Sequence, residues 1–225
     1  MQRATVSRSQ AILVAITPFI IISIIDGAFR EYLRHSPAWF WTFDLFKLLL
    51  LPTVSLLWLG RNYFVLPENY GLPAGARGEP WPYYLGFIAF VTAVLWFFLD
   101  FVGRMAWIAF GQPEPDLYFK SMAPNGVLRA PAVLYFAVTA GLFEEIFFRG
   151  LPLLYLQEKY PKAVPSALYI LGTSILFGAI HWENGPHEVV ATFLYGILAA
   201  TLYLRLRDLW PFVAAHSMID VWAFW

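Results

Sequence analysis

The sequence predicts an all-α membrane protein, a polytopic bundle of about seven transmembrane helices. Hydrophobic residues make up 60% of the 225-residue chain and charged residues only 13%, whereas soluble domains carry about 25% charged residues. The mean hydropathy is +0.60. A chain of this length has room for about six to eight spans of roughly 20 residues joined by short connections. We therefore expect one bundle of packed helices rather than several domains.

Three apolar segments fill the first half of the chain, and we expect them to be the first three spans. Residues 1–10 are polar, and the apolar run after them lacks a small-residue cleavage site, which predicts a retained span rather than a removed signal peptide. Asp44 and Lys47 can pair on one face of the second span, and Asp100 and Arg104 on one face of the third. We interpret both pairs as structural. The three spans are expected at 11–25, 39–59 and 81–110.

Glycine-rich and proline-rich stretches at 61–80 and 111–126 predict two loops. Four further apolar segments follow with short connections, and prolines stand where their helices are expected to begin or end. We therefore expect an N-terminal transmembrane region of three spans at 1–129 and a second region of four spans at 130–225. The four later spans are expected at 130–160, 164–181, 188–204 and 210–225.

The basic residues near the span ends favour an N-terminus inside the membrane and a C-terminus outside. Loops on the cytoplasmic side of a membrane carry more lysine and arginine than loops on the other side. With the N-terminus inside, the inner set is Arg3, Arg8, Arg61, Arg77, Arg149, Lys159, Lys162, Arg205 and Arg207. The outer set is then Arg30, Arg34, Lys120 and Arg129.

The segment 140–150 reads A-G-L-F-E-E-I-F-F-R-G and is the most costly part of the chain to place in a membrane. A charged side chain at the bilayer centre costs roughly 2.5–3.5 kcal/mol, so charges there indicate a functional site. Glu145 and Arg149 have the spacing of a helix ion pair. Glu144 points about 100° away from Glu145. It has no local partner among the neighbouring phenylalanines, which makes it the candidate general base.

Two later helices carry polar groups that a lipid-facing helix would not favour. Phe177 and His181 share a face at the end of the fifth span, and His216 and Asp220 share a face of the seventh. A carboxylate one turn from an imidazole can orient it and fix its tautomer. Each of these groups alone would fit a buried structural role. Together with Glu144 they predict a site that activates water.

In this order the three motifs resemble those of the CAAX protease and bacteriocin-processing family, which are glutamic-type intramembrane endopeptidases. Residues 144–149 match E-E-x-x-x-R, residues 177–181 match F-x-x-x-H, and residues 216–220 match H-x-x-x-(N/D). The resemblance covers 130–225 and implies that the last four spans form the catalytic core. It leaves 1–129 as a region specific to a subfamily.

The resemblance implies hydrolysis of a peptide bond by a water molecule that a glutamate and a histidine activate. No cofactor and no metal ion are implied. The residues expected to activate the water or stabilise the oxyanion are Glu144, His181, His216 and Asp220. The residues expected to shape the site are Glu145, Arg149 and Phe177. Position 220 is Asp rather than Asn, and an ionised Asp cannot donate a hydrogen bond. Asp220 must therefore be protonated or serve to hold His216.

Two other functions fit the same polar residues. A zinc-dependent membrane protease is one, because Glu, His and Asp are metal-ligand types. The segment that begins at His187 and Glu188 starts like H-E-x-x-H, but Ala191 stands in place of the second histidine. A non-catalytic immunity or secretion-helper protein is the other, and it would use the polar cluster for packing or binding.

The expected partners are a membrane-anchored protein or peptide substrate and the lipid bilayer. Prenylated tails, bacteriocin leaders and sorting tails of exported proteins are all compatible substrates. The formal net charge is zero and no basic stripe is present, so no nucleic-acid partner is expected. The absence of cysteine excludes disulfides and a thiol nucleophile. The expected location is the cytoplasmic membrane of a prokaryote with the N-terminus inside, and the oligomeric state is left open.

Overall fold

The computed structural model describes residues 6–33, 36–73, 78–111 and 126–225, and within these ranges every regular element is a helix, as the composition predicted. The first half contains α1 (Arg8–Leu33), α2 (Pro37–Asp44), the π-helix η1 (Leu45–Leu50), α3 (Leu51–Tyr63), the 3₁₀ turn η2 (Pro67–Tyr70) and α4 (Trp81–Phe110). The second half contains η3 (Gly126–Leu128), α6 (Arg129–Glu145), the π-helix η4 (Ile146–Gly150), α7 (Leu151–Lys159), α8 (Ser166–Ala179), η5 (Trp182–Asn184), α9 (Pro186–Leu206) and α10 (Trp210–Phe224).

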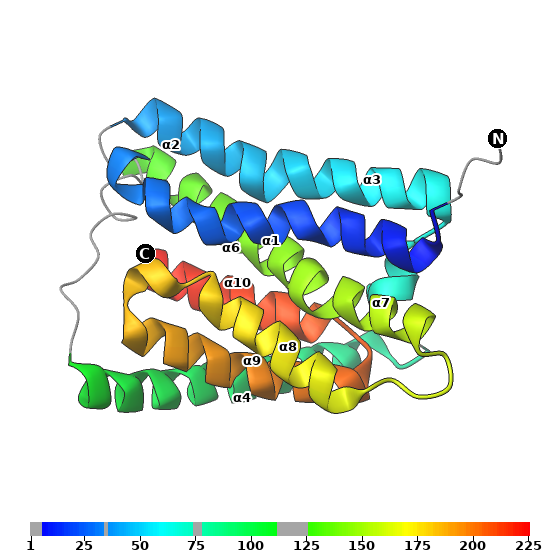
Figure 1. The fold of residues 1–225 in the computed structure, drawn as a ribbon. Helices are drawn as coiled ribbons and strands as arrows, with labels where there is room; N and C mark the ends of the chain where they lie inside the picture. The colour runs from blue at the N-terminus through cyan, green and yellow to red at the C-terminus, as the bar shows by residue number, and fades with distance from the viewer. Residues whose placement is uncertain (1–5, 34–35, 74–77, 112–125) are drawn as a thin grey trace.

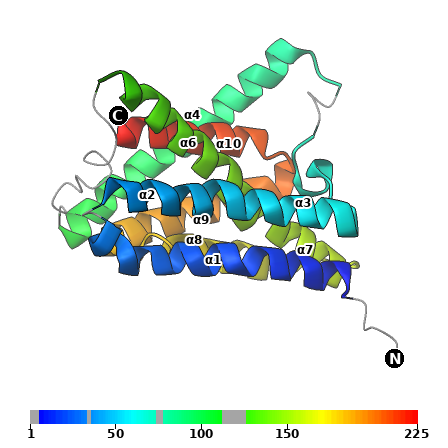
Figure 2. The same ribbon diagram turned by 90° about the horizontal axis from the view of Figure 1, so that it is seen from above.

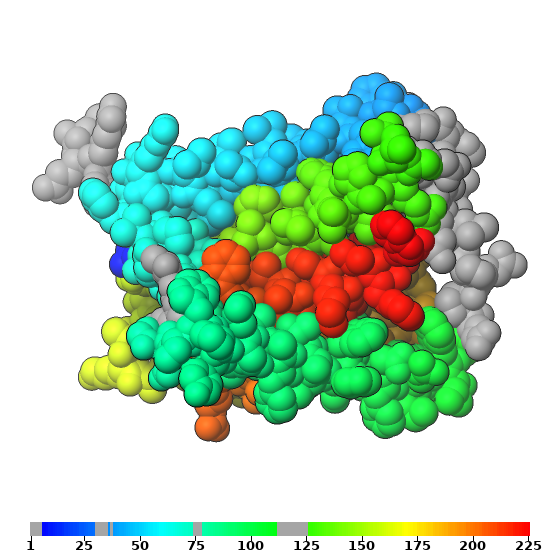
Figure 3. All heavy atoms as spheres, turned by 180° about the vertical axis from the view of Figure 1, so that it is seen from behind, coloured from blue at the N-terminus to red at the C-terminus, as the bar shows by residue number. Residues whose placement is uncertain are grey.

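The helices lie side by side in one bundle (Figure 1). α1 and the continuous helix formed by α2, η1 and α3 make one side of the bundle, and α4, α8 and α9 make the opposite side. The helix formed by α6, η4 and α7 lies between the two sides. Seen from above, α4 crosses the other helices obliquely (Figure 2). Figure 3 shows α10 between α4 and α6, both of which it contacts.

Among the described residues, five helical segments are long and apolar enough to cross a membrane, which is consistent with the expected integral membrane protein. They are Arg8–Phe29, Ala38–Tyr63, Trp81–Phe110, Gly126–Lys159 and Pro186–Leu206. The other two expected spans correspond to α8 and α10, with 14 and 15 residues. At 1.5 Å per residue these helices are about 21 and 23 Å long, less than the roughly 30 Å of a bilayer core. By this measure they are shorter than full-length spans.

Only part of the expected connections lies within the described residues. In the first loop, α3 continues to Tyr63 and ends where Phe64 adopts a left-handed conformation with φ of 53°. Gly71, with φ of 89°, lies against the ring of Tyr203, so this turn has room for glycine alone. Most of the expected loop at 111–126 lies outside the described residues, as do Arg3, Arg34, Arg77 and Lys120 of the orientation argument.

Gly141 allows α6 to approach α10 closely. A Cβ atom at position 141 would lie 2.9 Å from the backbone nitrogen of Ser217 and 3.1 Å from the carbonyl oxygen of Val213. Small residues at such contacts let two helix backbones approach each other within a membrane. The contact sets the position of α10 relative to the glutamate pair at the end of α6.

We expect Gly141→Ala to lower the free energy of unfolding by about 1–3 kcal/mol, because the added methyl group meets backbone atoms that cannot move aside. Any activity that depends on His216 should fall as well, since α10 carries this residue. Gly103→Ala on α4 is the matched control, because nothing lies within 4 Å of its added Cβ. Equal unfolding midpoints for both variants in a denaturant titration would contradict the close approach of α6 and α10.

Candidate active site

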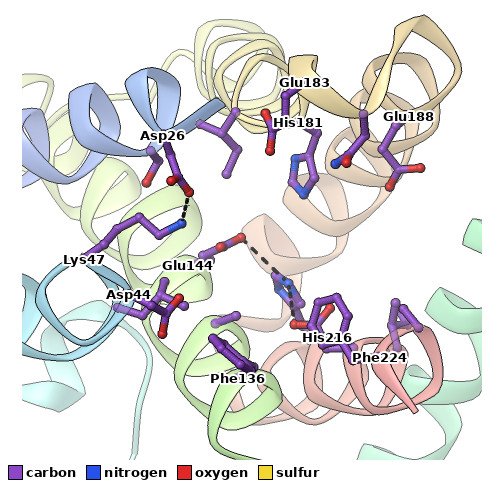
Figure 4. Close-up of a pocket in the computed structure, with 18 of the residues that line it drawn as sticks. Asp26, Asp44, Lys47, Phe136, Glu144, His181, Glu183, Glu188, His216 and Phe224 are labelled. Atoms are coloured by element: carbon purple, nitrogen blue, oxygen red, sulfur yellow. Dashed lines mark hydrogen bonds and ion pairs between the residues drawn. The ribbon is translucent and has the colours of Figure 1, made fainter. Parts of the chain in front are cut away.

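A cavity of about 300 Å³ lies between the N-terminal and the C-terminal helices. Side chains from α1, α2, η1, α6, η5, α9 and α10 line it (Figure 4). Four of the lining residues are the groups that the sequence predicted to activate water or stabilise an oxyanion, namely Glu144, His181, His216 and Asp220. The structure therefore brings these four side chains, which come from three separate motifs, to one cavity.

A change of helical register holds the glutamate pair in place. Glu145 ends α6, and the helix continues as the π-helix η4 before α7 begins. Pro152 accounts for the wide turn, because proline has no N–H group and its ring displaces the carbonyl group one turn before it. The N–H group of Leu151 instead donates to the carbonyl oxygen of Ile146, in π-helical geometry. Such single π turns occur frequently at functional sites.

Glu145 holds two cationic groups from a fully buried position. Its Oε1 atom lies 3.0 Å from Nη1 of Arg149 and 2.8 Å from Nδ1 of His216. The sequence predicted the contact with Arg149 and favoured Asp220 as the group that orients His216. In the structure Glu145 accepts the hydrogen bond from Nδ1, and Asp220 lies at the other ring nitrogen. Glu145 thus fixes the ring of His216 as well as pairing with Arg149.

The Nε2 atom of His216 faces two carboxylates at the cavity. Oε2 of Glu144 lies 3.8 Å from it and Oδ2 of Asp220 lies 3.7 Å from it. Both distances exceed a direct hydrogen bond. Within the described residues, Oε2 of Glu144 is buried without a hydrogen-bond partner. Three carboxylates around one imidazole favour its protonated form, in which Nε2 is a hydrogen-bond donor.

His181 presents its other ring nitrogen to the cavity. Its Nδ1 atom lies 2.8 Å from the carbonyl oxygen of Phe177, which can only accept, so Nδ1 carries the proton. In the neutral ring Nε2 is then the acceptor. The buried ring of Phe177 packs against both histidines, and the guanidinium carbon of Arg149 lies 4.0 Å from its centroid. Phe177 therefore lies in contact with both histidines and with Arg149.

Residues 126–222 match a family model described as type II CAAX prenyl endopeptidase Rce1-like. Over this segment the chain is similar to the Rce1-like family. The match agrees with the family resemblance of the three motifs and contains all of them. The match implies that this segment is that of a protease. A search of curated proteins and a search of solved structures each gave no match.

The N-terminal helices, which precede the segment matched by the Rce1-like family, supply a charged wall of the cavity. Asp26 of α1, Asp44 of α2 and Lys47 of η1 all line it. The sequence paired Lys47 with Asp44 on one helix face. In the structure Nζ of Lys47 instead forms an ion pair with Oδ2 of Asp26 on the neighbouring helix (Figure 4). The signal that could have identified this wall is the presence of three ionisable residues in apolar spans.

The helix that carries Asp44 and the helix that carries Glu145 have the same local structure. Asp44 immediately precedes the π-helix η1, as Glu145 precedes η4, and both π-helices are followed by a Leu-Pro pair. Pro52 acts like Pro152, since the N–H group of Leu51 donates to the carbonyl oxygen of Phe46 in the π-helical pattern. η1 also contacts α6 directly. Asp44 and Glu145 therefore each lie next to a π turn that a proline induces.

His187, which begins the segment that resembles a zinc-binding motif, lies outside the cavity. Among the described residues, no three His, Asp or Glu side chains are grouped as metal ligands. His187 is buried beside the ring of Trp107, and its Nε2 atom lies 3.9 Å from Oε2 of Glu188. It does not line the cavity, whereas Glu183 and Glu188 do. His187 therefore belongs to the packing between α4 and α9.

Proposed function

We propose that this protein is a glutamic-type intramembrane endopeptidase with its catalytic core in 130–225. The observation that carries the proposal is the arrangement around His216, whose Nδ1 atom is held by Glu145 while Nε2 lies beside Glu144 at the cavity. A fixed imidazole and a carboxylate without a hydrogen-bond partner are the two groups that hydrolysis by activated water requires.

In the proposed reaction Glu144 removes a proton from a water molecule that also donates a hydrogen bond to Nε2 of His181. The hydroxide attacks the carbonyl carbon of the substrate peptide bond and forms a tetrahedral intermediate. Glu144, now protonated, is placed to pass the proton to the leaving amine as the C–N bond breaks. Both steps follow general acid and base catalysis by one carboxyl group.

The oxyanion of the intermediate is stabilised by the protonated imidazole of His216. Loss of one such donor costs about 2.7–4 kcal/mol of transition-state stabilisation in a known hydrolase. Asp220 contributes negative charge beside Nε2, which favours the imidazolium form and keeps the donor available. In this role Asp220 acts in its ionised form, so it needs no proton of its own. Glu145, Arg149 and Phe177 hold the ring in place.

The test is quantitative mass spectrometry of peptide termini in host membranes. Cells with the wild-type protein are compared with cells that express Glu144→Gln at the same level. We expect a membrane-associated precursor to accumulate in the variant and its cleaved terminus to disappear. Identical profiles would contradict proteolysis and favour a binding or immunity role. A cleavage activity that a chelator removes and zinc restores would overturn the glutamic mechanism.

We further propose that the protein lies in the cytoplasmic membrane of a prokaryote with its N-terminus inside. Val127 is almost fully exposed at the start of the second half, and Lys162 lies in the exposed turn between α7 and α8. In the chain without native cysteine, we expect Val127→Cys to react with an impermeant thiol reagent from outside. Lys162→Cys should react only after the membrane is opened. The reverse pattern would overturn the orientation.

A further inference from the structure

The cavity is strongly acidic. Its lining contains six carboxylates, namely Asp26, Asp44, Glu144, Glu183, Glu188 and Asp220. The basic groups in the same lining are one ammonium group, of Lys47, and the imidazoles of His181 and His216. The carboxylates outnumber these groups even when both imidazoles are protonated. A cavity with this balance attracts positive charge and disfavours anionic ligands.

Asp44, like Glu144, has a carboxylate oxygen in this lining that is buried without a hydrogen-bond partner among the described residues. Asp44 is 6% exposed, and within the described residues its Oδ2 atom has no hydrogen-bond partner. The nearby ammonium group of Lys47 is engaged by Asp26. Burying a carboxylate costs several kcal/mol unless it is paired and hydrogen-bonded. Oδ2 of Asp44 is therefore open to a donor group that enters the cavity, while the Tyr135 hydroxyl and the Lys47 ammonium lie near the same carboxylate.

The cavity also fits the uncharged part of a long basic side chain. Phe40, Phe43, Phe136 and Phe224 line it together with the carboxylates. Lysine and arginine pack their methylene groups on apolar surface while the charged end reaches a polar partner. Aromatic ring faces also attract cationic groups. A volume of about 300 Å³ is at the small end of ligand pockets, so it accommodates a short peptide segment.

The position of Asp44 places such a side chain close to the reacting bond. Asp44 lies on the same wall as Lys47, and Glu144 is one of the charged groups near it (Figure 4). η1, which begins directly after Asp44, contacts α6, which carries Glu144. A cation bound by Asp44 is thus a neighbour of the catalytic carboxylate and belongs to a residue near the scissile peptide bond.

We propose that the cavity binds a lysine or arginine side chain of the peptide substrate and that Asp44 selects it. The inference rests on the proposed function and adds its substrate class, a membrane-associated peptide with a basic residue beside the cut. The selecting residue comes from the N-terminal helices, before the segment that matches the Rce1-like family. This position gives 1–129 a role in specificity.

The probes for the test are palmitoylated peptides in phosphatidylcholine vesicles that hold the full-length protein. Members of the set differ at one position, which carries lysine, arginine or norleucine, and this position is moved along the peptide. Binding is measured by titration and cleavage by mass spectrometry of the same samples. At one position we expect the lysine or arginine peptide to bind at least about tenfold more tightly than the norleucine peptide, as for a charged hydrogen bond.

Asp44→Asn should bring that ratio close to one, whereas Asp44→Glu should keep a preference for the basic peptide. Asp100→Asn is the matched control, because Asp100 pairs with Arg104 on an exposed face of α4 away from the cavity. It should leave the ratio unchanged. The unfolding midpoint of Asp44→Asn should equal or exceed that of the wild type, since a buried carboxylate with an unpaired oxygen becomes an uncharged amide. A purely structural Asp44 would give a lower midpoint.

Each outcome separates the inference from the proposed function. Equal binding of basic and norleucine peptides at every position would overturn the inference, whether or not they are cleaved. An unchanged ratio in Asp44→Asn would do the same. Selective binding that depends on Asp44 but leads to no cleavage would support the inference and contradict the proteolytic function. If Asp44→Asn does not fold, the wild-type ratio and the ratio for Asp44→Glu decide the question.

Discussion

Replacing Glu144 by glutamine is expected to lower kcat for peptide cleavage by about 10²–10⁴-fold, the range that one general base contributes. Glutamine keeps the shape of the side chain but cannot accept a proton from water. The change should therefore act on kcat, with the fold and the protein level preserved. The measurement is the rate of product formation in vesicles with the substrate identified from host membranes.

Glu68→Gln is the control for this substitution, because Glu68 is exposed in η2 and lies outside the cavity. Its kcat should equal that of the wild type. Glu144→Asp should fall between the wild type and Glu144→Gln, since the carboxylate is kept but retracted by one methylene group. A Glu144→Gln enzyme that retains wild-type kcat would show that another group activates the water.

The fold could be predicted from the sequence because its strongest signals are local. The apolar segments at 81–110 and 188–204 correspond to Trp81–Phe110 and Pro186–Leu206, since length and hydropathy determine spans directly. The two π-helices were not predicted. Pro52 and Pro152 were visible within apolar helices, but a proline kink, a helix end and a π turn share the same sequence signal.

The site could be predicted where its residues share one helix and only in part where they meet across helices. The Glu145–Arg149 contact follows from spacing, and its distance of 3.0 Å agrees with the expected pair. The bond from His216 to Glu145 joins residues far apart in the chain, so periodicity cannot reveal it. The pairing of Lys47 with Asp26 was missed for the same reason, because a nearer carboxylate on the same helix was the simpler partner.

Arg149→Met is expected to be the most destabilising of the substitutions considered, with a loss of about 3–5 kcal/mol in the free energy of unfolding. Arg149 and Glu145 are 1% and 0% exposed, and removal of the guanidinium leaves the buried charge of Glu145 compensated by His216 alone among its two cationic partners. The measurement is a denaturant titration in mixed micelles. Arg8→Met is the control, because Arg8 pairs with Glu158 at a distance of 3.0 Å but both are about one-third exposed. It should cost far less.

The double variant Glu145→Gln with Arg149→Met tests whether the Glu145–Arg149 pair only stabilises the fold or whether Glu145 also contributes to catalysis through His216. Removing both charges should restore most of the stability lost in Arg149→Met, because no buried charge is left unpaired. Activity should not return with it, since a neutral glutamine at 145 no longer favours the imidazolium form of His216, the proposed oxyanion donor. Recovery of stability without recovery of kcat would assign Glu145 to the chemistry through His216. Recovery of both would reduce the buried pair to a packing role and leave Asp220 as the carboxylate that supports the imidazolium.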